Sequence, residues 1–101
     1  MTDLILLWQA DNDIQAAFNR CEEYQPGRGE IFMRHLDATF TVMRLHPKLA
    51  RFYAAPYRRC LLRDFPYGIF YEAQPKRLIV AAIMDLRQDP RSILQKLGLP
   101  R

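Results

Sequence analysis

The 101-residue sequence lacks the features that mark a secreted, membrane-inserted or metal-binding protein. Its two cysteines, Cys21 and Cys60, lie far apart and have no Cys or His neighbour at metal-ligand spacing. No apolar run approaches the roughly 20 residues of a transmembrane helix, and the N-terminus has no basic region followed by a long apolar stretch. We therefore expect a cytoplasmic protein without cofactor, metal or membrane contact. Its cysteines should be reduced core residues, with a disulfide as the alternative.

Internal repeats, linkers and low-complexity tracts are also missing, so residues 1–101 should form a single domain. Half of the residues are hydrophobic, which is enough for a real core. The net charge of +4 is unevenly placed: residues 1–37 hold seven acids and three bases, whereas residues 38–63 hold six bases and no acid. Such a segment attracts phosphates or an acidic protein surface. A solvated basic face with no dedicated partner is the alternative.

The first half of the chain predicts one strand and two helices. Residues 4–8 are an apolar run that is too short for a helix and typical of a covered strand. A helix should follow from the cap candidates at 11–13 to the Pro-Gly turn at 26–29, and a second from near Glu30 to just before Pro47. Their apolar stripes are Ile14, Ala17, Phe18 and Cys21, then Phe32, Leu36, Phe40 and Met43. Joined by a short turn, the two helices should form an antiparallel hairpin.

In the second half, the period of the hydrophobic pattern changes to two. Residues 57–63, 67–72 and 77–86 read as strands joined by short turns, followed by a short helix from Ser92 to Leu97. The sequence thus predicts an α+β fold of order β-α-α-β-β-β with a short C-terminal helix. An antiparallel-rich four-stranded sheet should pack against the N-terminal helical hairpin, leaving its other face relatively open.

The second half of the sequence resembles the RelE/ParE toxin superfamily. Residues 57–72 run from a basic strand through Phe65-Pro66-Tyr67 into a tyrosine-rich strand, and residues 78–90 resemble the last strand of the family and its Asp-Pro exit. The resemblance covers residues 52–91 well, and the helical hairpin agrees in order and length. It implies the toxin of a type II toxin–antitoxin module. The cognate antitoxin would wrap the toxin with a helix and an extended segment, in a heterotetramer or a larger complex.

The superfamily has two targets: RelE-like members cut messenger RNA in the ribosome, and ParE-like members inhibit DNA gyrase. RNA cleavage requires a base, an acid and cations. Here Leu61 stands where relatives have a second lysine, Gly68 where they have a phosphate-clamping arginine, and Asp85 where many have a histidine. Arginine cannot replace the missing acid or base, because it stays protonated. If the protein is a nuclease, the candidate catalytic residues are Arg59, Arg63 and Arg87.

These departures favour a non-catalytic, ParE-like gyrase inhibitor. The ribosome-dependent nuclease and a member with weak or lost toxicity are the alternatives. A plain nucleic-acid-binding module built on residues 44–63 is a third, although the segment has few aromatics at base-stacking spacing.

For a protein that binds its target, arginine and tyrosine are the expected contact residues. The candidate target-binding residues are Arg58, Arg59, Arg63, Tyr67, Arg87 and Arg91, with Tyr71 as a second aromatic anchor. Tyr71 could instead pack within the sheet, and Arg87 and Arg91 could simply pair with nearby aspartates. Leu7 and Trp8 are expected in the core, and the two histidines, His35 and His46, are expected to be structural or merely exposed.

Overall fold

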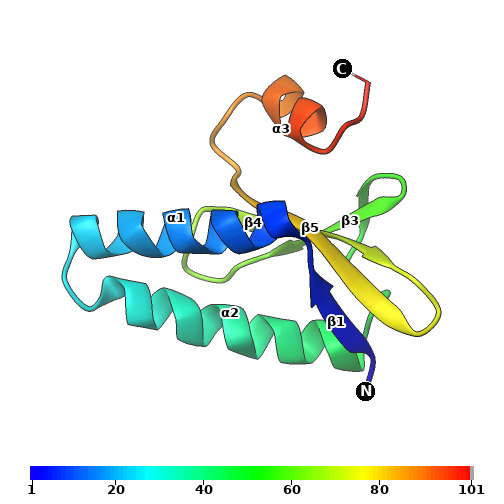
Figure 1. Ribbon diagram of the computed structural model, residues 1–101, viewed down its shortest axis with the longest axis horizontal. Helices are drawn as coiled ribbons and strands as arrows, with labels where there is room; N and C mark the ends of the chain where they lie inside the picture. Colours follow the sequence, from blue (N-terminus) through cyan, green and yellow to red (C-terminus); the bar gives the residue numbers. More distant parts are fainter. Residues whose placement is uncertain (101) are drawn as a thin grey trace.

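The computed structural model describes residues 1–100. A strand and a helical hairpin are followed by a meander and a short helix, and Figure 1 shows α3 set apart from the hairpin. The elements are β1 (Asp3–Leu6), α1 (Trp8–Tyr24), α2 (Arg28–Leu45), β2 (Phe52–Ala54), β3 (Tyr57–Leu61), β4 (Tyr67–Ala73), β5 (Arg77–Asp85) and α3 (Pro90–Lys96).

One mixed sheet contains all the strands, in the order β1-β5-β4-β3-β2. β1 runs parallel to β5, with Leu4 opposite Leu78, and the other pairs are antiparallel. The α+β class and the antiparallel-rich sheet are confirmed, but the expected count of four strands is wrong because the sheet has five. The extra strand, β2, has only three residues, which is too short for an alternating pattern to reveal it in the sequence.

The main core lies between the sheet and the hairpin of α1 and α2. Phe32 of α2 is fully buried and meets the rings of Phe65 and Tyr67 edge-on, each at a centroid distance of 5.6 Å. Tyr71 of β4 is also fully buried, and its hydroxyl donates a 2.9 Å hydrogen bond to the carbonyl of Pro47. The alternative that Tyr71 packs within the sheet is therefore correct. Both cysteines are free thiols.

A smaller core lies on the opposite face of the sheet, under α3. It consists of Phe70, Ala82, Met84, Ile93 and Leu97. The expectation of an open face is thus only partly right. The short helix begins before Ser92, because Asp89 accepts a 2.8 Å bond from the amide of Arg91 and Pro90 occupies the first turn.

The start of α1 differs most from the sequence-based expectation. The helix begins at Trp8, three residues before the predicted cap, and no side chain caps it. Asp13 instead accepts a 3.0 Å bond from the amide of Ile83, which ties the helix to β5. Trp8 is 77% exposed and Leu7 45%, so the prediction that they belong to the core is wrong. α2 also begins earlier than predicted, at Arg28 instead of Glu30.

Candidate functional site

Arg59 lies in the middle of β3 on the face of the sheet that α3 partly covers. It is paired with Phe70, and its guanidinium lies 5.2 Å from the ring centroid of Tyr53. A Cβ atom at Gly68 would come within 3.2 Å of Cγ of Arg59 and within 2.9 Å of Leu86. The missing side chain at Gly68 therefore leaves room for the aliphatic part of Arg59. Gly68 thus allows the half-buried guanidinium of Arg59 to lie over the ring of Tyr53.

Arg58, the neighbouring residue, faces the hairpin side and serves the fold. Its Nη1 donates hydrogen bonds to the carbonyls of Ala50 at 2.8 Å and Lys48 at 3.3 Å, and its guanidinium lies 4.0 Å from the ring centroid of Phe52. These contacts hold the segment between α2 and β2 against the edge of the sheet. A contact of Arg58 with a target would compete with them.

Arg63 and Tyr67 frame the turn between β3 and β4. Arg63 is exposed, and its carbonyl lies 3.1 Å from Nδ1 of His35. Tyr67 is only 4% exposed, and its hydroxyl accepts a 3.2 Å hydrogen bond from Nε of Arg20. The prediction that Tyr67 is a surface anchor is therefore wrong, because its ring belongs to the core.

Arg87 and Arg91 each pair with an aspartate two residues earlier. Arg87 reaches Asp85 at 2.7 Å, and Arg91 reaches Asp89 at 2.9 Å. The hydrogen bond from Arg87 holds the pKa of Asp85 below its usual value, and the bond from Arg91 does the same to the pKa of Asp89. The alternative that Arg87 and Arg91 pair with nearby aspartates is confirmed. Because both arginine side chains remain about three-quarters exposed, at 75% and 73%, their outer N–H groups stay accessible.

The three candidate catalytic arginines do not converge. Arg59 stacks on Tyr53 on the α3 side of the sheet. The backbone carbonyl of Arg63, which lies beyond the end of β3, contacts His35 of α2. Arg87 lines a cleft beside α1 that includes neither Arg59 nor Arg63.

An apolar groove, which was not among the predicted sites, lies between the C-terminal end of α2 and the edge of β3. Its volume is about 280 Å³, and its lining includes Val42, His46, Leu49, Cys60 and Leu61. Leu49 is 71% exposed and Leu61 60% exposed. All of its lining except Tyr71 comes from the acid-free segment 38–63, and the lining includes the cation Arg59. The leucines that lie between the arginines of this segment were the sequence signal that could have revealed the groove.

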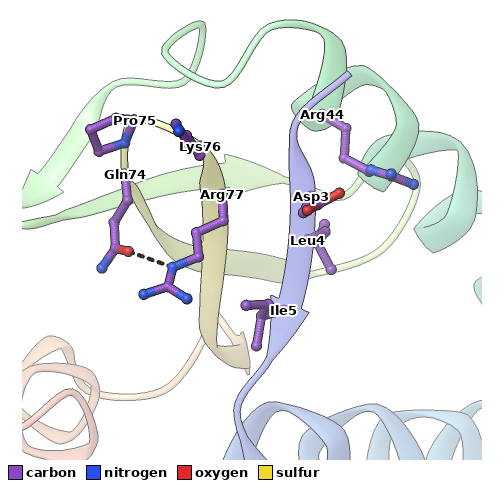
Figure 2. A pocket seen from close by; sticks show the side chains of 8 residues that line it. All are labelled: Asp3, Leu4, Ile5, Arg44, Gln74, Pro75, Lys76 and Arg77. Atoms are coloured by element: carbon purple, nitrogen blue, oxygen red, sulfur yellow. Dashed lines mark hydrogen bonds between the residues drawn. The ribbon is translucent and has the colours of Figure 1, made fainter.

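Another surface hollow, of about 830 Å³, lies where β1 pairs with the start of β5, and its lining contains none of the predicted site residues (Figure 2). Nε of Arg77 donates to Gln74 at 2.9 Å, and Nε of Arg44 donates to the carbonyl of Thr2 at 2.8 Å. Figure 2 shows these arginines on opposite sides of β1. Arg44 and Arg77 are thus held apart and do not form a shared site in this hollow.

No helix within residues 1–100 is long and apolar enough to cross a membrane.

A solved structure similar to this chain is a chain of a chromosomal ParDE TA system from P. aeruginosa. The TM-score is 0.75 and the identity 12%, and the match covers 86% of this chain and 98% of that one. No protein-family model matches the sequence, and a search of curated proteins finds no match. At this identity, the likeness concerns the fold. This chain has a ParE-like α+β fold, as the resemblance in its sequence implied.

Proposed function

We propose that this chain is the toxin of a type II toxin–antitoxin module and that it inhibits DNA gyrase by binding, without cutting RNA. The observation that carries the proposal is the separation of Arg59, Arg63 and Arg87 onto different parts of a ParE-like fold. A nuclease would need those cations around one phosphate, together with groups that move protons.

The surroundings of Arg59 support binding over chemistry. Its neighbours on that face are Tyr53, Phe70 and the backbone of Gly68. A guanidinium is too basic to serve as a general base. Half-buried over an aromatic ring, Arg59 has the character of a contact residue in a protein interface. Arg63, Arg87 and Arg91 would extend this contact surface with their exposed guanidiniums.

The antitoxin is the partner that we assign to the apolar groove between α2 and β3. An apolar hollow built mainly from a segment with six bases and no acid is complementary to an amphipathic segment with acidic flanks. Leu49 and Leu61 would be the buried centre of that contact, and Lys48 and Arg51 part of its charged rim. Arg59 also lines this groove, so the target surface and the antitoxin surface would meet at Arg59.

Induced expression tests the toxin proposal. We expect growth to stop when the chain is produced alone and to recover when a short acidic antitoxin encoded beside it is produced too. Messages mapped by primer extension should stay intact during the arrest, while plasmid supercoiling falls. Cleavage of messages at ribosomal pauses, lost in Arg59→Ala, would overturn the gyrase proposal. Unimpaired growth would overturn the toxin proposal.

Paired substitutions test the antitoxin groove. The double variant Leu49→Ser with Leu61→Ser should still fold, because both side chains are mostly exposed, but should lose rescue by the antitoxin. The matched control is Trp8→Ser, which removes a side chain that is 77% exposed outside the groove and should keep rescue. Equal rescue of both variants would place the antitoxin elsewhere.

A further inference from the structure

A second basic site lies at the turn of the helical hairpin, away from both Arg59 and the apolar groove. It is a cleft of about 440 Å³ between the C-terminal half of α1, the start of α2 and the turn that joins β3 to β4. Arg20, Arg28 and Arg87 come from three parts of the chain to line it. Tyr24 stands at its wall and is 83% exposed, and the turn from Asp64 to Tyr67 forms the other side.

All three guanidiniums are held in place by their own neighbours. Arg20 donates through Nε to the hydroxyl of Tyr67 at 3.2 Å. Arg28 lies 4.5 Å from the ring centroid of Phe65 and donates through Nη2 to the carbonyl of Asp64 at 3.4 Å. These contacts use few of the five N–H donors of each side chain. Pre-positioned donors lose less conformational freedom when an anion binds.

The nearby carboxylates do not neutralise Arg20 and Arg28. Glu22, which lies between them in the sequence, accepts from the amides of Gly27 at 3.1 and 3.2 Å and of Gly29 at 2.8 Å, so it caps α2 instead. Within residues 1–100, the two ion pairs are Arg87–Asp85 and Arg91–Asp89.

The lining carries three guanidiniums and one carboxylate, that of Asp64. The positive field also reaches the thiol of Cys21 in the cleft wall. Burial raises the pKa of that thiol, while Arg28 and Arg20 act to lower it.

We propose that this cleft binds a nucleotide unit through its phosphate, with the ring of Tyr24 as a stacking surface for the base. Planar guanidiniums match phosphate oxygens in pairs, and an exposed aromatic ring beside a basic cleft is the arrangement that holds nucleotide bases. A free nucleotide and a nucleotide within a strand offer this same chemistry. The inference does not depend on the toxin role.

Fluorescence anisotropy with a labelled oligothymidylate of about ten nucleotides tests the cleft. The double variant Arg20→Gln with Arg28→Gln should bind at least about tenfold more weakly and lower the salt slope by about 1.4, as expected for two lost single-strand contacts. The matched control, Lys76→Gln with Arg77→Gln, removes the same charge from exposed residues outside the cleft. It should change the affinity less than about twofold if binding is local to the cleft. Thermal unfolding of each variant checks that the fold is intact.

Competition separates the two sources of the nucleotide. Thymidine monophosphate that displaces the labelled strand would identify a free nucleotide as sufficient, whereas displacement by unlabelled strand alone would identify a nucleic-acid strand. Tyr24→Ala should weaken binding of the strand but leave displacement by inorganic phosphate unchanged. If the cleft variant and its control lost affinity equally, the binding would depend on overall charge and not on the cleft, and the proposal would be overturned. Absence of binding to all of these probes would overturn it too.

Discussion

The two faces of the sheet differ in how they are covered, and the difference separates folding from recognition. Two helices of 17 and 18 residues cover one face and bury Phe32, Tyr67 and Tyr71. The seven-residue helix α3 covers part of the other, where Arg59 is only half-buried. Because apolar burial stabilises in proportion to its area, the hairpin face supplies most of the stability. The thinly covered face has room for a binding surface.

The strongest way to break this comparison is Phe32→Ala in the hairpin core. The ring is fully buried and contacts two other aromatic rings, so its loss should lower the free energy of unfolding by about 3–5 kcal/mol. Urea unfolding followed by circular dichroism measures the change. A loss below about 1 kcal/mol would contradict the claim that this face dominates, since ordinary surface substitutions cost no more than that.

The corresponding truncation under α3 should cost less. Ile93 is 3% exposed but belongs to a helix of only seven residues, which can relax around the gap. We expect Ile93→Ala to cost about 2 kcal/mol, the low end for such truncations, in the same urea experiment. A loss equal to that of Phe32→Ala would mean that the two faces contribute alike.

Two adjacent arginines sharpen the comparison further. Arg58→Ala removes charged hydrogen bonds to the carbonyls of Ala50 and Lys48 and should cost about 1.5–3 kcal/mol. Arg59→Ala removes a stacking contact with Tyr53 and should cost about 0.5–1 kcal/mol. Urea unfolding of both variants measures the two losses, and each variant serves as the control for the other. A reversed order would show that Arg59, and not Arg58, is the structural residue.

The smallest effect concerns pH and the Asp85–Arg87 pair. The bonds from Arg87 lower the pKa of Asp85 in the folded state, so the pair adds stability above the unfolded pKa and loses it as the pH falls through the folded pKa. Asp85→Asn should therefore be slightly less stable than the parent near about pH 7 and equally stable well below about pH 4. Thermal unfolding at both pH values measures this. A difference that grows in acid would contradict the assignment.

The helices and the meander could be predicted from the sequence because their patterns are long. Residues 14–21 and 32–43 repeat at helical spacing, residues 57–63 and 67–72 alternate, and residues 78–84 form an apolar run. Short elements could not be recognised: β2 spans three residues, and α1 begins at Trp8 without a capping side chain. An apolar run that changes from strand to helix within one residue carries no periodic signal at the change.

The candidate site was harder to predict because side-chain direction depends on register. Arg58 and Arg59 look equivalent in the sequence, yet they lie on opposite faces, one bonded to carbonyls and the other over a ring. Tyr67 was a candidate target-binding residue, but its ring packs against Phe32 of α2. The basic cleft could not be foreseen at all, because Arg20, Arg28 and Arg87 meet only in the folded chain.

The most direct test of the central claim, that this protein acts by binding gyrase through the arginines on and beside the α3 side of its sheet, is a supercoiling assay with purified gyrase and the purified chain. We predict that the parent protein slows supercoiling and that Arg59→Ala combined with Arg63→Ala loses most of this inhibition while its thermal midpoint falls only by the few degrees that a loss of about 0.5–1 kcal/mol implies. Inhibition that survives the double substitution, or an absence of inhibition by the folded parent protein, would contradict the account.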